Sequence, residues 1–101
     1  MRALVSIQWD WYPTDYVAEN RIRIWVDFDG EAEYYSPLLS VGGPAHIGRI
    51  HAESYLKAEL QLVRKRLGGD LNEVDTGWRQ IAYRDGRRRH YRTVRLRERT
   101  G

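Results

Sequence analysis

The residues of this chain with the clearest chemical meaning are the arginines near its C-terminus. Residues 79–101 contain nine arginines, no lysine and only two acidic residues, Asp85 and Glu98, so this segment has a formal charge of +7. Residues 1–78 contain eight Lys or Arg and twelve Asp or Glu, a formal charge of −4. Guanidinium groups bind phosphates and carboxylates through paired hydrogen bonds, and they stack on aromatic rings. The segment therefore predicts a surface for an anionic partner and does not identify a reaction.

Most of these arginines fall in a predicted β-hairpin. Residues 78–84 and 87–97 have the pattern of strands, and Asp85-Gly86 between them is a typical hairpin turn. Alternation along the second strand divides its side chains between two sides. One side carries Arg87, Arg89, Tyr91 and Arg95; the other carries Arg88, His90, Arg92, Val94 and Leu96.

An arginine-lined ribbon of this kind fits a phosphate backbone, with Tyr91 or His90 stacking on a base. It fits an acidic protein surface equally well, because Arg and Tyr are favoured anchors at protein interfaces. A third interpretation is that the arginines only solvate the edge of a sheet. We expect a partner that is nucleic acid or an acidic, nucleic-acid-handling protein complex. The candidate binding residues are Arg84, Arg87, Arg88, Arg89, His90, Tyr91, Arg92, Arg95 and Arg97.

Aromatic residues are crowded into the N-terminal third of the chain. Trp11, Tyr12 and Tyr16 fall in a segment, residues 10–20, that reads as a loop, and Trp25 alternates away from the apolar side of its strand. Exposed aromatic residues often mark a recognition surface, whereas in a thin domain they also cover the core. Trp11, Tyr12 and Trp25 are therefore possible aromatic anchors.

Two further functions are weighed against simple nucleic-acid binding. The run GWRQIAYRDGRRRHYRTVRL loosely resembles the closing strands of bacterial mRNA-cleaving toxins, in which arginine stabilises the reacting phosphate and His or Tyr moves protons. Arg89, His90, Tyr91 and Arg92 supply those residue types, but the toxins place helices early and this chain begins with strands. The chain is also similar in type to phage-encoded inhibitors of host defence, such as anti-CRISPR proteins. We expect a binding protein and not an enzyme.

The sequence offers little to a metal or cofactor. There is no cysteine, and His46 and His51 are five residues apart, which on a helix separates them by roughly 140°. Asp27 and Asp29 alternate onto one side of a strand and could hold Mg²⁺, but solvated hairpin ends explain them more simply. Glycine-rich phosphate-binding motifs are absent. We expect neither a metal nor a cofactor.

Apolar periodicity divides the chain into five strands and one helix. Alternation predicts strands over residues 3–9, 21–28 and 31–35, before the two strands of the arginine-rich hairpin. A helix over residues 46–67 is predicted by apolar spacings of four, four, three and four, formed by Ala52, Leu56, Leu60, Val63 and Leu67. We expect an α+β fold: a mainly antiparallel five-stranded sheet, in sequence order β-β-β-α-β-β, with the long helix packed on a face.

The connections are predicted from Gly, Pro and polar residues. Residues 36–45 and 70–77 read as loops. At Asp29-Gly30 the pattern favours a three-residue turn with Gly30 in the left-handed conformation, because we expect that register to keep the apolar face of the hairpin apolar.

The length of 101 residues predicts one domain, residues 1–101. The start of the chain lacks a signal-like apolar run, and no stretch approaches the roughly 18–20 apolar residues of a membrane span. We expect a soluble cytoplasmic protein without membrane contact. An exposed strand edge would also support a homodimer.

Overall fold

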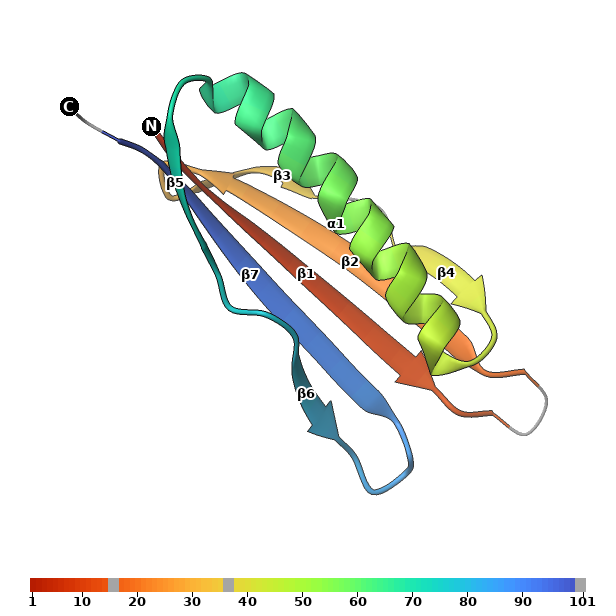
Figure 1. The fold of residues 1–101 in the computed structure, drawn as a ribbon. Helices are drawn as coiled ribbons and strands as arrows, with labels where there is room; N and C mark the ends of the chain where they lie inside the picture. Colours follow the sequence, from red (N-terminus) through yellow and green to blue (C-terminus); the bar gives the residue numbers. More distant parts are fainter. Residues whose placement is uncertain (15–16, 36–37, 100–101) are drawn as a thin grey trace.

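The computed structural model describes residues 1–14, 17–35 and 38–99, which form seven β-strands and one α-helix (Figure 1). These elements are β1 (Arg2–Tyr12), β2 (Glu19–Phe28), β3 (Glu31–Tyr35), β4 (Leu39–Gly42), α1 (Ala45–Leu67), β5 (Leu71–Asp75), β6 (Arg79–Ala82) and β7 (Arg88–Glu98). The predicted α+β class, an antiparallel sheet with one long helix on a face, is confirmed. The molecule is elongated, with principal extents of 55 by 21 by 21 Å.

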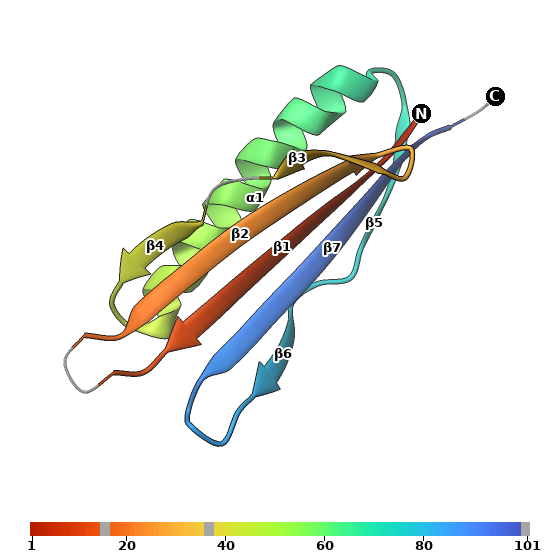
Figure 2. The same cartoon turned by 180° about the vertical axis from the view of Figure 1, so that it is seen from behind.

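All strand pairs in the sheet are antiparallel. Three long strands form its centre in the order β2-β1-β7. The outer edge of β2 pairs with β3 at one end and β4 at the other, and the outer edge of β7 pairs in the same way with β5 and β6. The first and last strands of the chain therefore lie side by side in the middle of the sheet (Figures 1 and 2).

One face of the sheet packs against α1 and holds the core, as the strand and helix periodicities predict. Odd-numbered positions of β1 and even-numbered positions of β2 and β7 point to this side. The predicted helix stripe is buried against them, which confirms it. The core residues are Ala3, Val5, Ile7, Trp9, Ile22, Ile24, Val26, Phe28, Ala52, Leu56, Leu60, Val63, Leu67, Val94 and Leu96.

The ends of α1 follow from local chemistry. Pro44, with φ of −69°, immediately precedes the helix, where its missing N–H removes no helical hydrogen bond. Gly68 ends the helix in the left-handed region at φ of 66°, and its N–H donates to the carbonyl of Arg64 at 2.9 Å. The observed helix begins one residue before the predicted one and ends at the same residue.

A buried polar contact holds the start of α1 onto the sheet. Asn20 is fully buried; its Oδ1 accepts from Trp9 Nε1 at 2.8 Å, and its amide nitrogen donates to the carbonyls of Gly43 and Pro44 at 3.2 and 3.3 Å. Gly48 permits the close approach, because a Cβ there would lie 2.0 Å from Asn20 Oδ1 and 2.4 Å from Trp9 Nε1. The first turns of the helix are thus fixed above β1 and β2.

Two segments predicted as loops contain short edge strands, so those loop predictions are wrong. β4 lies within residues 36–45 and β5 within residues 70–77. Backbone pairing with β2 and β7 defines both strands. The two strands are only four and five residues long and most of their side chains are exposed, so neither provides the long buried alternation by which a sequence reveals a strand.

The first hairpin also differs from its predicted register. Phe28 pairs with Glu31, so the turn has two residues, and Asp29 and Gly30 both have positive φ, 52° and 86°. A register shift within the hairpin then sets Val26 opposite Tyr34. The prediction of a three-residue turn is wrong because Asp29 accommodates the left-handed conformation, and the irregularity lies in the strand pairing instead.

The segment predicted as a loop, residues 10–20, begins and ends within β-strands. Trp11 and Tyr12 are the last residues of β1, and they pair with Asn20 and Glu19. Tyr16 lies outside the described residues. Across the described chain, no helix combines the length and the apolar character that crossing a membrane requires.

Candidate functional site

The face of the sheet opposite α1, here called the uncovered face, is overlaid by no other element of the described chain (Figure 2). Directly paired residues of neighbouring strands point to the same side of a sheet. Asp10 pairs with Arg89, Gln8 with Tyr91, and Leu4 with Arg95. Because Asp10, Gln8 and Leu4 alternate with the buried residues of β1, the odd-numbered side chains of β7 lie on the uncovered face.

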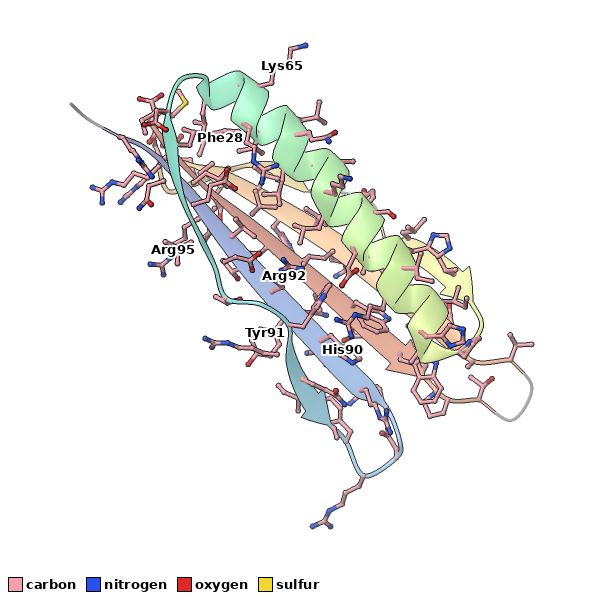
Figure 3. All side chains as sticks on the ribbon, in the orientation of Figure 1. Phe28, Lys65, His90, Tyr91, Arg92 and Arg95 are labelled. Carbon is pink, nitrogen blue, oxygen red and sulfur yellow. The ribbon has the colours of Figure 1, made fainter. Side chains whose placement is uncertain are left out.

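The structure separates the predicted site residues into three groups. Those on the uncovered face are Arg89, Tyr91, Arg95 and Arg97. Those on the helix side of β7 are Arg88, His90 and Arg92. Arg84 and Arg87 lie in the connection between β6 and β7. Figure 3 shows Tyr91 and Arg95 in relation to His90 and Arg92.

His90 is part of the core. Its exposed fraction is 9%, its ring stacks on Trp9 with 3.9 Å between centroids, and its Nδ1 lies 3.2 Å from the Trp9 carbonyl oxygen. That distance identifies Nδ1–H as the donor, because a carbonyl oxygen can only accept. Burial lowers the pKa of His90, so the ring is neutral at pH 7. Because the ring is buried, it is not accessible to a base.

Two arginines of β7 are engaged in ion pairs within the fold. Arg89 donates from Nε and Nη2 to the two carboxylate oxygens of the buried Asp10, at 2.9 and 3.2 Å. Arg92 binds Asp75 of β5 in the same two-pronged way, with Nε 2.9 Å from Oδ1. These hydrogen bonds raise the pKa of both guanidinium groups and lower the pKa of Asp75. Both arginines primarily stabilise the sheet.

The end of the sheet near Tyr12 combines arginines with aromatic rings. Arg21 lies 4.5 Å from the centre of the Tyr12 ring, and Arg87 lies 4.2 Å from Tyr83 and 5.9 Å from Tyr12. Cation–π contacts of this kind satisfy the guanidinium faces and leave their edges able to donate. Arg84 is exposed beside them in the turn.

The three proposed aromatic anchors do not share one surface. Tyr12 and Trp25 are half-buried on the uncovered face, as their alternation with Trp11 and Ile24 requires. Trp11 points to the helix side, where its Nε1 donates to the Gly43 carbonyl at 3.4 Å and Arg88 lies 5.9 Å from its ring. Trp11 therefore closes the start of α1 against the sheet.

The opposite end of the uncovered face carries arginines without acidic partners. Arg95 and Arg97 are exposed, and within the described residues neither forms an ion pair. Arg2 is the direct cross-strand partner of Arg97, and Arg79 of β6 is the partner of the exposed Tyr91. We call Arg79, Tyr91, Arg95, Arg97 and Arg2 the arginine row.

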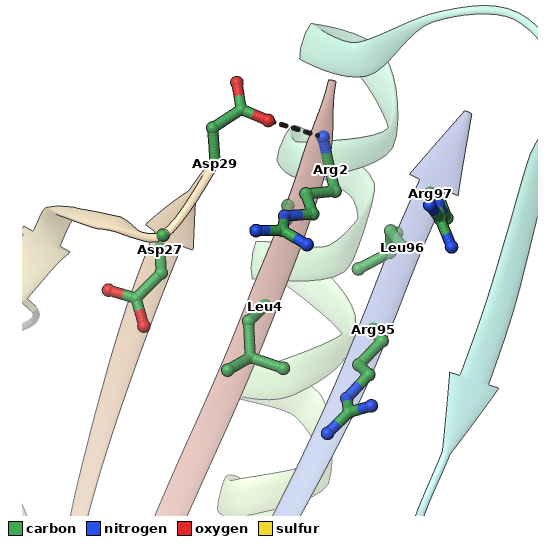
Figure 4. A pocket seen from close by; sticks show the side chains of 9 residues that line it. Arg2, Leu4, Asp27, Asp29, Arg95, Leu96 and Arg97 are labelled. Carbon is green, nitrogen blue, oxygen red and sulfur yellow. Dashed lines mark hydrogen bonds between the residues drawn. The ribbon is translucent and has the colours of Figure 1, made fainter.

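A pocket of about 420 Å³ lies at the end of the arginine row (Figure 4). Arg95 and Arg97 line one side and Asp27 and Asp29 the other, with Leu4 between them. The backbone N–H of Arg2 donates to Asp29 Oδ1 at 3.0 Å, which ties β1 to the first hairpin turn. We call this cavity the strand-end pocket.

Arg2 and Arg79 are the site residues that the sequence analysis missed. Arg79 could have been found from the predicted hairpin, because counting back from the turn sets it near Tyr91. Arg2 joins Arg97 only through the pairing of β1 with β7, two strands separated by nearly the whole chain. Periodicity within a segment carries no signal for such a long-range pairing.

The described residues contain no group of three or more His, Asp or Glu side chains placed to hold a metal ion. His46 and His51 lie on α1, on the other side of the sheet from the arginine row. Comparison of the sequence with protein-family models and with curated proteins finds no match. The fold and the surface define this chain as an α+β protein, with a helix on one face of its antiparallel sheet and an arginine row on the other.

Proposed function

We propose that this chain is a non-enzymatic nucleic-acid-binding protein that binds its ligand on the uncovered face. The observation that carries the proposal is the pair of exposed arginines, Arg95 and Arg97, which have no ion-pair partner among the described residues. Arg89 and Arg92 of the same strand differ from them, because each of these arginines has an acidic partner within the fold. Guanidinium groups left without one remain available to a phosphate backbone.

The spacing of the arginine row suits an extended strand of nucleic acid. Arg95 and Arg97 are two residues apart on β7, a rise of about 7 Å, and Tyr91 lies about 13 Å further along. Tyr91 is 38% exposed, so its ring can stack on a base while the arginines hold the backbone. Proteins that bind single strands combine a basic track with aromatic stacking in this way.

The placement of His90 argues against a ribonuclease site that uses this histidine. A ribonuclease site needs its proton-transferring group within hydrogen-bond reach of the phosphate that the arginines hold. His90 is buried on the helix side of the sheet, where it stacks on Trp9, whereas Arg89, Tyr91 and Arg95 point to the uncovered face. The ring of His90 and the arginine row are therefore on opposite sides of the sheet.

A protein-directed inhibitor, of the kind phages encode against host defence complexes, is the second candidate. Two apolar side chains favour it: Val74 is 56% exposed opposite Arg95, and Ile81 is 43% exposed opposite Arg89. Apolar groups beside arginine and tyrosine are typical of protein interfaces. In this case the arginine row would bind an acidic, nucleic-acid-handling partner.

Salt-dependent binding of short single-stranded and duplex oligonucleotides tests the first proposal. We expect binding at 50 mM salt that weakens steeply as salt rises. The double variant Arg95→Gln/Arg97→Gln should flatten the log–log slope for a single strand by about 1.4, since each phosphate contact contributes roughly 0.7. The matched control is Lys57→Gln/Lys65→Gln, which removes two charges from the exposed surface of α1.

An equal change of slope in both double variants would contradict the proposal, because it would show that only the net charge of the protein, and not the position of the arginines, sets the salt dependence. The absence of oligonucleotide binding, combined with capture of a host protein that survives nuclease treatment, would favour the protein-directed candidate.

A further inference from the structure

We propose that the strand-end pocket binds a terminal phosphate monoester, so that the protein recognises the end of a nucleic-acid strand. This inference rests on the proposed function and adds a specific ligand group to it. The pocket lies where the arginine row ends, and it combines three arginines with two aspartates around one cavity (Figure 4).

The register of the sheet explains why the pocket has two sides of opposite charge. Leu4 pairs with Asp27 on one flank and with Arg95 on the other, so the three residues form a row across β2, β1 and β7. The next row on this face places Arg2 opposite Arg97, with Asp29 beside Arg2. Neighbouring strands are about 4.8 Å apart, which separates the acidic flank from the arginine flank by roughly 10 Å at the backbone.

The guanidinium groups of the pocket are not neutralised by its carboxylates. Asp29 accepts from the backbone N–H of Arg2, and in the part of the chain that the structure describes no ion pair joins Asp27 or Asp29 to Arg2, Arg95 or Arg97. Arg2 and Arg97 also face each other directly, a like-charge pair that costs free energy unless an anion lies between them. The pocket thus presents three guanidinium groups that an anion can bind without breaking an ion pair within the described residues.

A terminal phosphate fits this arrangement better than an internal phosphodiester does. A monoester carries close to two negative charges at neutral pH and offers three terminal oxygens, whereas a diester carries one charge. The three guanidinium groups around the cavity can donate to all three terminal oxygens of a monoester, whereas a diester offers only two unesterified oxygens. The three arginines therefore favour a strand that ends in the pocket.

The rest of the bound strand would follow β7 away from the pocket. From Arg97 to Tyr91 is six residues, about 20 Å along the strand, with Arg95 between them and Arg79 beside Tyr91. A short oligonucleotide with its phosphorylated end at Arg97 would bring a base to the Tyr91 ring. The pocket fixes the register, and the arginine row supplies the remaining contacts.

The test compares oligonucleotides that differ only at their ends. A five-nucleotide single strand with a 5′-phosphate, one with a 3′-phosphate and one with two hydroxyl ends are titrated against the full chain. We expect one phosphorylated end to bind about tenfold more tightly than the hydroxyl-ended strand. Arg97→Gln should abolish that preference, while Lys65→Gln on α1 should keep it.

The second variant is Asp27→Asn, and we expect it to bind the oligonucleotides more tightly than the wild type does. Removing one negative charge from the pocket should tighten the phosphorylated strand more than the hydroxyl-ended strand, because the monoester carries the larger charge, and so widen the preference severalfold. Partial unfolding could explain a loss of binding in Arg97→Gln, but it cannot produce tighter binding in Asp27→Asn. An unchanged preference in both variants would overturn the proposal.

A nucleoside monophosphate, added as a competitor, tests whether the pocket takes a free phosphate monoester or only the phosphorylated end of a strand. Binding of all three oligonucleotides with equal affinity would overturn the pocket proposal and leave the proposed function intact. Binding of the nucleoside monophosphate, sensitive to Arg97→Gln, without oligonucleotide binding would support the pocket and overturn the proposed function. Competition by the monophosphate together with a preference for a phosphorylated end would support both.

Discussion

The two sides of β7 differ in what their polar side chains do, although they alternate along one strand. On the helix side, His90 stacks on Trp9 and Arg92 binds Asp75, so each polar group has a partner inside the protein. On the uncovered face, Arg89 binds Asp10, but Arg95 and Arg97 have no acidic partner among the described residues. Part of the arginine charge therefore belongs to the fold, and only the remainder is available to a ligand.

Among substitutions on the helix side, Gly48→Ala is expected to lower the free energy of unfolding the most. The new Cβ would overlap Asn20 and Trp9, both buried, and would break the hydrogen bond between them. Overpacking and a lost buried hydrogen bond together should lower the free energy of unfolding by about 3 kcal/mol, measured by chemical denaturation. Ser54→Ala, at an exposed position of the same helix, should leave it unchanged or raise it slightly.

Arg89→Gln should cause the next largest loss of stability. It leaves the buried Asp10 carboxylate with Gln8, whose amide donates to it at 3.0 Å, as its remaining side-chain partner. We expect the free energy of unfolding to fall by about 2 kcal/mol, because a poorly paired buried charge is costly. Arg95→Gln, three pairs further along the same face, is the control, and an equal loss there would contradict the distinction between paired and unpaired arginines.

His90 predicts a pH dependence of stability. Burial lowers its pKa in the folded state, whereas in the unfolded chain it binds a proton near pH 6.5. The unfolded state therefore binds more protons below that pH, and stability should fall as pH drops from 7 toward 5. Comparing denaturation midpoints of the wild type with those of His90→Phe isolates this contribution, which should disappear in the variant. A parallel decline in both proteins would show that other groups cause it.

Substitution of Arg95 and Arg97 should affect stability least, although these two arginines are expected to contribute most to binding. Arg95→Gln/Arg97→Gln should change the free energy of unfolding by less than about 0.5 kcal/mol, since both side chains are exposed. Removing the charge opposite Arg2 should even be slightly favourable. Thermal denaturation of the variant that lost oligonucleotide affinity checks this directly, and a marked drop in Tm would mean that the loss of binding reflects unfolding.

The sequence predicts the parts of this fold that bury a face. The helix stripe from Ala52 to Leu67 and the alternation in residues 21–28 each repeat with the period of their element, so a single segment reveals them. The short strands β4 and β5 expose most of their side chains and exist through pairing with β2 and β7, which a local pattern does not encode.

The candidate site was predictable only in outline. The alternation of Arg95 and Tyr91 against Val94 and Leu96 follows from the strand period. The partners that engage Arg89 and Arg92 come from β1 and β5, and the fully buried Asn20 was not anticipated at all. The pairing of strands that are distant in the sequence decides which arginines have acidic partners. A count of charges along the sequence does not reveal this.

The most direct test of the binding face is an NMR titration with a short single-stranded oligonucleotide, observing the arginine Nε–H signals and the Tyr91 ring. The uncovered-face account predicts that the signals of Arg95, Arg97 and Tyr91 shift together with increasing ligand, while those of Arg49 and Arg64 on α1 do not. Shifts concentrated on α1, with the arginine row unchanged, would contradict it.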